Sequence, residues 1–339
     1  MNNIETYKTI VIVGQPNAGK STLYNVLSDI KTSTSNFSGT SVQVTECLIN
    51  VMGDTYKLVD LPGTYSLNPA DLAEKVTVDY LLNNKIDLLI NVVDGTLLAR
   101  NLELTIELLE FGLPMVIALN MHDEAKDKGL DINPNELKKI TGLEVVPITA
   151  LFGKGVKQLI DVCDDILQKG GGIPKVLSYT KHIEKKVDEL ATELEPITNK
   201  LQGNSRFYAI KALENPELIP KNIADFAENR RKQFEAEILT EHNTDIFEAI
   251  SYERHHLAMK VAEQISKFVK KNNIPFLIQI DKFLLHPIFG YFALIIFNLL
   301  LFGTIFYVGT FLAELVQPGL DFISGLYSPL KASHPFWWY

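Results

Sequence analysis

The sequence predicts three parts: an α/β domain with a mostly parallel, doubly wound sheet, an all-α domain, and a membrane-spanning helix. Short β-branched apolar runs alternate with helical patterns in the first half of the chain. This alternation is typical of parallel strands connected by helices. Beyond a glycine-rich stretch only helical periodicity remains, and no Asp, Glu, Lys or Arg occurs between Lys282 and Glu314.

Length and charge limit the class of protein. The chain has 339 residues, with 32 Lys+Arg and 41 Asp+Glu, and therefore a formal net charge of −9. This length predicts two or three structural units. The acidic balance argues against a nucleic-acid partner, which would require a basic surface. Two cysteines, Cys47 and Cys163, exclude a disulfide scaffold and suit a reducing compartment.

Five apolar runs define the expected sheet of the first part. Each run is too short for a helix and is followed by turn residues, as expected of strands buried on both faces. The runs are residues 9–13, 57–60, 88–94, 115–120 and 144–148. The glycine-rich residues 170–174 are the best linker candidate, so the α/β domain is placed at residues 1–172.

The second part, residues 173–273, is predicted to be helical throughout. Apolar residues recur at the spacing of one buried helical face, and no strand-like run intervenes. The apolar positions of the first and last expected helices are Ile183, Val187, Leu190, Leu194, Leu257, Val261, Ile265 and Val269.

The third part, residues 274–339, contains the expected membrane helix. Residues 288–312 are long enough to cross a hydrocarbon core of about 30 Å at about 1.5 Å per residue. The alternative is a buried helix of a large soluble protein. Lysines 267, 270, 271 and 282 precede the span, whereas Glu314 and Asp321 follow it. Because positive flanks stay inside, residues 1–273 are predicted to be cytoplasmic.

A phosphate-binding motif follows the first predicted strand. Residues 14–21 (GQPNAGKS) fit G-x-x-x-x-G-K-[ST] and precede a helical pattern, which is the context that this motif requires. Backbone N–H groups and the helix N-terminus would surround the phosphates. We expect Lys20 to reach the β- and γ-phosphates and the Ser21 hydroxyl to bind Mg²⁺. The alternative is a simple glycine-rich turn. The expected contacts are Gly14, Gln15, Pro16, Asn17, Ala18, Gly19, Lys20, Ser21 and Thr22.

A second phosphate-linked motif, Asp60-Leu61-Pro62-Gly63, ends the next buried strand. The aspartate can hold Mg²⁺ through water, and the Gly63 N–H can sense the γ-phosphate. A D-x-x-G sequence alone is a weak signal, because Asp and Gly are ordinary loop residues. Its position after a strand, behind the first motif, gives it weight.

Two later loops predict guanine specificity. Asn120-Met121-His122-Asp123 follows a strand, and the Asp123 carboxylate can accept hydrogen bonds from guanine N1–H and the 2-amino group. Adenine has neither donor, so this residue favours guanine. Asn120 would brace the loop, and His122 is expected to be a solvent-facing spacer. A backbone N–H of Thr149-Ala150-Leu151 could meet guanine O6. Four loops at the ends of strands predict a guanine-nucleotide site.

These motifs resemble a Ras-like, α/β P-loop G domain, and the whole chain resembles the FeoB ferrous-iron transporters of bacteria. Residues 36–42 (NFSGTSV) are similar to the family's switch I, and residues 60–67 (DLPGTYSL) to its switch II. Residues 252–265 resemble the last helix of the family's cytosolic helical domain. Residues 281–290 resemble the stretch that enters its first transmembrane helix. The resemblance therefore implies a GTPase that controls ferrous-iron uptake.

The resemblance also implies roles for individual residues. Alignment on Gly39 gives Ser41 as the switch I hydroxyl for Mg²⁺, with Thr40 as the neighbouring candidate. Thr64 stands where Ras-like proteins place a glutamine, which implies slow intrinsic hydrolysis. Asn17 is similar to the asparagine that coordinates K⁺ in potassium-activated G proteins, so a K⁺ activator is expected; the alternative is a turn residue. Asn17, Lys20 and Gly63 are the expected catalytic groups.

The implied partners are GTP and GDP, the lipid bilayer, Fe²⁺, a small FeoA-like protein and further copies of the chain. The family's transport region has many membrane helices, which implies a multi-pass protein of the bacterial cell membrane. One alternative is a regulatory GTPase that is anchored by a single helix and has no transport path. A soluble GTPase of ribosome assembly is disfavoured by the acidic charge, and an adenine-nucleotide enzyme by Asn120 and Asp123.

Overall fold

The computed structural model describes residues 7–28, 31–34, 44–269, 280–281 and 283–333. The chain divides into two compact units, Met1–Lys270 and Lys271–Tyr339, which are described separately.

A seven-stranded sheet forms the centre of the first unit, in the order β2-β3-β4-β1-β5-β6-β8. The five apolar runs are all strands of this sheet. They are β1 (Lys8–Gly14), β4 (Asp54–Asp60), β5 (Leu88–Asp94), β6 (Met115–Asn120) and β8 (Glu144–Pro147). These five are mutually parallel. β3 (Thr45–Val51) pairs antiparallel with β4, and the edge strand β2 (Lys31–Thr34) pairs antiparallel with β3.

Both faces of the sheet are covered, which explains why the central strands are apolar throughout. Ile10 and Ile12 of β1 share a core with α1 (Lys20–Ser28) and α6 (Val156–Lys169). Val11 and Val13 point to the other face, where α2 (Leu72–Asn83) and α3 (Leu98–Phe111) pack. This arrangement confirms the predicted doubly wound α/β fold.

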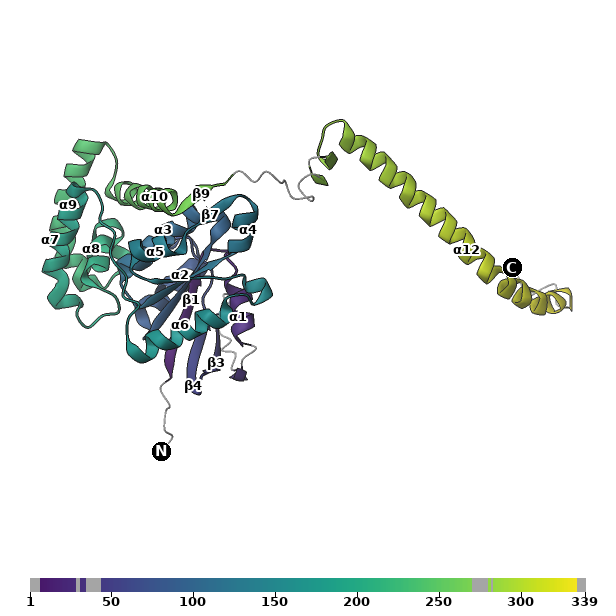
Figure 1. The fold of residues 1–339 in the computed structure, drawn as a ribbon, viewed down its shortest axis with the longest axis horizontal. Helices are drawn as coiled ribbons and strands as arrows, with labels where there is room; N and C mark the ends of the chain where they lie inside the picture. Colours follow the sequence, from purple (N-terminus) through teal and green to yellow (C-terminus); the bar gives the residue numbers. More distant parts are fainter. Residues whose placement is uncertain (1–6, 29–30, 35–43, 270–279, 282, 334–339) are drawn as a thin grey trace. The chain divides into compact units, whose positions relative to one another are not determined.

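Four helices follow the sheet: α7 (Lys181–Thr198), α8 (Ser205–Glu214), α9 (Lys221–His242) and α10 (Ile246–Ile265). Their apolar faces join the same core as α2 and α3, and α10 packs against α3. The helical and α/β parts therefore form one compact unit. The division at residue 172 remains a prediction. Figure 1 shows α7, α8 and α9 gathered beside the sheet, with α10 leading back toward β7 and β9.

The predicted helix-only pattern of the second part is wrong at its end. α10 ends at Ile265, and the short strand β9 (Ser266–Phe268) pairs antiparallel with β7 (Leu130–Ile132). Val269 therefore lies beyond the helix, where its side chain is 52 % exposed rather than on the buried face. A strand of three residues is too short to give a recognisable alternation of apolar and polar residues. The small helices α4 (His122–Asp127) and α5 (Pro134–Thr141) flank β7.

The second unit contains α12 (Phe289–Ser333), of which Phe289–Ser324 has the length and apolar composition of a membrane span. It is the single such helix among the described residues, with a mean hydropathy of 2.2 in its most apolar window. The Asn298 side-chain amide donates to the Leu294 carbonyl oxygen at 2.8 Å, one turn back along the helix. This bond satisfies the one amide side chain inside the predicted span 288–312.

Candidate functional site

The phosphate-binding loop connects β1 to α1 at the carboxyl edge of the sheet. Lys20 opens α1 and is buried, and its ammonium group donates to the Gln15 carbonyl oxygen at 3.0 Å. Burial lowers the pKa of Lys20, and this effect outweighs the opposing charge of Asp60. Asn17 is exposed and has a left-handed backbone conformation, with φ of 67°. The loop therefore surrounds a buried cation, as binding of a polyphosphate requires.

The Ser21 hydroxyl and the Asp60 carboxylate meet beside this lysine. Ser21 Oγ donates to Asp60 Oδ2 at 3.1 Å. The other oxygen, Oδ1, is buried and has no hydrogen-bond partner. Burial raises the pKa of Asp60, although Ser21 and Lys20 oppose the shift. A buried carboxylate oxygen beside a hydroxyl fits Mg²⁺, which takes oxygen ligands and binds proteins through one or two carboxylates together with substrate phosphates.

Gly63 approaches the phosphate-binding loop so closely that a side chain would not fit. A Cβ atom at this position would lie 2.8 Å from the Pro16 nitrogen and 3.0 Å from Lys20 Nζ. The next residue, Thr64, is fully buried, and its hydroxyl donates to the Ser66 carbonyl oxygen. The Thr64 side chain is thus committed to an internal bond, whereas the Gly63 backbone lies beside the loop.

Asn120 ties the two predicted guanine loops to the phosphate-binding loop. Its side-chain amide donates to the Ala18 carbonyl oxygen at 2.9 Å, and its Oδ1 accepts from the Ala150 N–H at 3.0 Å. An adjacent cavity of about 240 Å³ has Asp123 in its wall. The lining residues that had been predicted to contact nucleotide are Gly19, Thr22, Asn120, Met121, Asp123, Thr149 and Leu151. The structure therefore gathers the predicted base contacts around one cavity.

His122 differs from its prediction as a solvent-facing spacer. The residue is half-buried, its Nδ1 atom is buried without a hydrogen-bond partner, and burial lowers its pKa. His122 is the first residue of the short helix α4, whereas the sequence predicted a loop position there. The predicted switch I residues Gly39, Thr40 and Ser41 lie outside the described residues.

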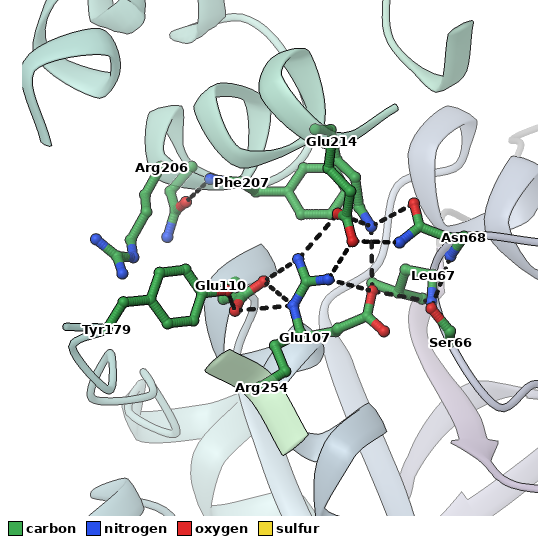
Figure 2. Close-up of polar contacts among 12 residues, drawn as sticks. Ser66, Leu67, Asn68, Glu107, Glu110, Tyr179, Arg206, Phe207, Glu214 and Arg254 are labelled. Atoms are coloured by element: carbon green, nitrogen blue, oxygen red, sulfur yellow. Dashed lines mark hydrogen bonds and ion pairs between the residues drawn. The ribbon is translucent and has the colours of Figure 1, made fainter. Parts of the chain in front are cut away.

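A buried charged cluster, missed by the sequence analysis, holds the segment that follows Gly63 (Figure 2). The Leu67 N–H donates to Glu107 of α3 at 3.0 Å. The Asn68 side chain donates to Glu214 at 2.7 Å and accepts from Lys211 at 2.9 Å, both on α8. Lys211 also lies 3.1 Å from Glu107 and 3.2 Å from Glu214. The segment that follows the second motif is therefore bonded directly to the helical part through Asn68.

Arg254 of α10 completes the cluster. Its guanidinium binds Glu110 and Glu214, with Nη2 at 2.9 Å and 3.0 Å from one oxygen of each. Glu110 also accepts from the Tyr179 hydroxyl. Burial would raise the pKa of Glu214, but Arg254 and Lys211 outweigh this effect and lower it to about 2. One signal in the sequence pointed to this cluster: Lys211 is a charged residue between apolar positions of a predicted helix.

Known proteins that are similar to this chain share one family. Residues 8–163 match the family profile of ferrous iron transport protein B, and residues 179–267 match that of the FeoB cytosolic helical domain. The chain is 29 % identical to a Fe(2+) transporter FeoB of Staphylococcus aureus (strain COL) over 321 residues, covering 94 % of this chain and 47 % of the relative. A Helicobacter pylori (strain ATCC 700392 / 26695) Fe(2+) transporter FeoB is 45 % identical over 142 residues, covering 42 % of this chain and 22 % of the relative.

Solved structures give the same result. A mutant S. thermophilus NFeoB bound to GDP is 31 % identical, with a TM-score of 0.67, and covers 77 % of this chain and 100 % of its own. The cytosolic domain of the T. maritima FeoB iron transporter in GMPPNP form is 28 % identical, with a TM-score of 0.64, and covers 77 % and 99 %. The chain spans about half the length of the S. aureus relative.

Proposed function

Because the chain belongs to the FeoB family of ferrous iron transport proteins and has the family's G-domain fold, we propose that it binds and hydrolyses GTP to gate or drive Fe²⁺ uptake across a bacterial membrane. The observation that carries the proposal is the meeting of four loops at the ends of β1, β4, β6 and β8, with Asn120 bonded to two of them. Guanine nucleotides bind at such loop clusters on parallel sheets.

The phosphate half of the site would act through Lys20, Ser21 and Asp60. The Lys20 ammonium and the loop N–H groups bind the phosphates, and the buried position of Lys20 strengthens its interaction with them. Ser21 and Asp60 hold Mg²⁺, with a switch I hydroxyl from Ser41 or Thr40. Mg²⁺ supplies neutralisation of the phosphate charge when bound.

The base half would act through Asp123 and the loops beside it. Asp123 accepts from guanine N1–H and the 2-amino group, and the N–H groups of residues 149–151 reach O6. The Met121 side chain lies in the cavity wall, where it supplies an apolar contact for the base. Asn120 keeps these loops at a fixed distance from the phosphate-binding loop through its two hydrogen bonds.

Hydrolysis would proceed by attack of water on the γ-phosphorus, with cleavage of its bond to the β–γ bridging oxygen and release of GDP and phosphate. The Gly63 N–H marks the γ-phosphate position. Thr64 does not orient the water, since its hydroxyl is bonded to Ser66, and we therefore expect slow intrinsic hydrolysis. The exposed Asn17 side chain would coordinate K⁺, which would offset charge in the transition state as an arginine finger does.

The helical domain would relay the state of the nucleotide. Residues 61–71 form the expected switch II, and Leu67 and Asn68 within it are bonded to Glu107, Lys211 and Glu214. A switch segment that reorders when phosphate leaves would have to change these bonds. Residues 1–273 would lie in the cytoplasm, and α12 would be the first membrane span of a multi-pass protein. A small FeoA-like protein, as in the A/B fusion protein of Porphyromonas gingivalis, and further copies of the chain are proposed partners.

Fe²⁺ uptake by lipid vesicles that contain the complete protein tests the proposal. We expect GTP with Mg²⁺ to raise the uptake rate, and Asp123→Ala to abolish the effect of GTP because the base contact is lost. Lys157→Ala, an exposed position on α6, is the control. Uptake that does not respond to GTP would contradict the coupling. GTP hydrolysis without any Fe²⁺ uptake would favour a membrane-anchored regulatory GTPase with no transport path of its own.

A further inference from the structure

A two-stranded sheet links the guanine loop to the segment that leads toward α12. In β7 and β9, Leu130 lies opposite Phe268, Asp131 opposite Lys267, and Ile132 opposite Ser266. Main-chain hydrogen bonds extend the pairing at both ends. The Val269 N–H donates to the Gly129 carbonyl oxygen at 2.8 Å, and the Asn133 N–H donates to the Ile265 carbonyl oxygen at 2.7 Å.

On one side, this strand pair follows the helix that lines the base cavity. Helix α4 supplies Asp123, Glu124 and Asp127 to the cavity wall, and only residues 128 and 129 separate α4 from β7. The Ala125 side chain of α4 is fully buried, and Ile132 of β7 is 3 % exposed. α4 packs directly against β7. A base that binds against α4 therefore acts on an element that is packed onto β7.

On the other side, the strand pair is close in sequence to the membrane helix. β9 follows α10 without a gap and ends at Phe268, and α12 begins at Phe289. β9 is the last described element of the first unit before the chain continues into the second unit. The γ-phosphate contact lies elsewhere, because the segment after Gly63 is bonded to Glu107 and Glu214 instead.

We propose that the β7–β9 pair senses occupancy of the guanine site: the bound base stabilises the pairing, and an empty site weakens it. The inference rests on the guanine-nucleotide binding proposed above. A two-stranded sheet with three residues per strand is marginally stable on its own, so its opening equilibrium lies where a ligand can shift it. GDP and GTP carry the same base and therefore have the same effect. The coupling is reciprocal. The factor by which the bound base favours the paired strands is also the factor by which opening of the strands weakens nucleotide binding.

Amide hydrogen exchange of the full 339-residue chain in lipid nanodiscs tests the proposal. We expect the Val269 and Asn133 amides to exchange about fivefold or more slowly with bound GDP than with an empty site, and equally slowly with a non-hydrolysable GTP analogue. The proposal would be overturned if these two amides exchanged at equal rates in the empty and the filled protein. It would also be overturned if their exchange rates differed only between the protein with GDP and the protein with the GTP analogue. Absence of saturable GDP binding would contradict the proposed function itself, which is a separate result.

Substitutions in the pair test the reciprocal effect. Asp131 and Lys267 are exposed and face each other across the strands, so Asp131→Lys sets like charges opposite each other and weakens the pairing. We expect this variant to bind GDP about fivefold more weakly, and the charge-exchanged Asp131→Lys/Lys267→Asp variant to recover the affinity. If the charge-exchanged variant does not recover GDP affinity, the weaker binding is due to Asp131 alone, and the proposal is overturned.

A glycine pair provides the matched control. A Cβ atom at Gly129 would lie 2.9 Å from the Val269 carbonyl oxygen, with φ of +84°, whereas Gly170 has φ of +79° and open space around it. Gly129→Ala and Gly170→Ala therefore carry similar backbone strain, but the first alone forces the strands apart. We expect weaker GDP binding in Gly129→Ala only. Equal affinities in the two variants would contradict the link between strand pairing and nucleotide binding.

Discussion

Removal of the buried ammonium group of Lys211 should destabilise the cytosolic unit far more than removal of a surface lysine. The Lys211 side chain is 1 % exposed, and the carboxylates of its partners Glu107 and Glu214 are 4 % and 0 % exposed. Lys211→Met removes the cation nearest to the buried Glu107 carboxylate. The next cation is the Arg254 guanidinium, which lies 3.9 Å from that carboxylate. Breaking a buried ion pair in this way costs about 3–5 kcal/mol of unfolding free energy.

A second substitution separates lost charge from lost packing. Glu107→Gln in the Lys211→Met background removes the uncompensated charge and keeps an oxygen that can accept from the Leu67 N–H. We expect the double variant to recover at least about 2 kcal/mol, since neutralising both partners of a buried pair costs little. Lys186→Met is the control, because Lys186 and Glu237 are 28 % and 34 % exposed and such pairs contribute about 0–1 kcal/mol.

Urea unfolding of residues 1–270, which form one compact unit, measures these values. A loss below about 1 kcal/mol for Lys211→Met, or no recovery in the double variant, would refute the assignment of Lys211 as the cation that holds switch II through a buried charge.

Three further predictions concern the nucleotide site. Asp123→Asn should weaken GDP binding about 10- to 100-fold, as expected when a hydrogen bond to a charged group is lost. The same variant should improve binding of xanthosine diphosphate, whose 2-oxo group accepts a hydrogen bond from the new amide. Calorimetric titration with both nucleotides measures these affinities, and an unchanged preference for GDP would contradict the role of Asp123. GTP hydrolysis should be faster in KCl than in NaCl, and Asn17→Ala should remove that difference; equal rates in the two salts would contradict K⁺ binding. Burial raises the pKa of Asp60, so the neutral form persists to higher pH than for an exposed aspartate. Because Mg²⁺ binds the ionised form, the affinity of the GDP complex for Mg²⁺ should fall with decreasing pH, starting at a higher pH than for an exposed carboxylate. In Asp60→Asn this contribution should be lost, and only the fall due to protonation of the GDP phosphate should remain.

The sequence was sufficient where structure follows from local pattern. The five parallel strands are buried on both faces, so apolar side chains at successive positions identified them. The loops that follow them converge because parallel strands end at the same edge of the sheet. Asn120 is the clearest case, since its position between the phosphate and base loops follows from that topology, and its two hydrogen bonds agree with the bracing role expected of it.

Long-range polar contacts could not be predicted in this way. Lys211 lies next to Ile210 on α8, and its partners Glu107 and Asn68 are 104 and 143 residues away in sequence. No local window contains these partners, so the sequence can show Lys211 as a charge among apolar residues but cannot identify the residues with which it pairs. The pairing of β9 with β7 has the same cause, because three residues carry too little periodicity and the partner strand lies before α5.

The cytosolic unit thus has two separate attachments to the nucleotide site, and they would report different things. The proposed switch II segment is bonded to α3 and α8 through Leu67 and Asn68, and it contains Gly63, the residue proposed to meet the γ-phosphate. This attachment can distinguish GTP from GDP, because only a group that one nucleotide has and the other lacks can make the two nucleotides shift an equilibrium differently. The β7–β9 pair depends on the base, which both nucleotides share, so it can distinguish only an empty site from a filled one.

If hydrolysis controls uptake, substitutions at Asn68 should change the response of uptake to GTP against GDP, whereas substitutions at Asp131 should not. If nucleotide release controls uptake, substitutions at Asp131 should instead change uptake by the filled protein relative to the empty protein, whereas substitutions at Asn68 should not. Fe²⁺ uptake measured with the two sets of variants decides between these mechanisms.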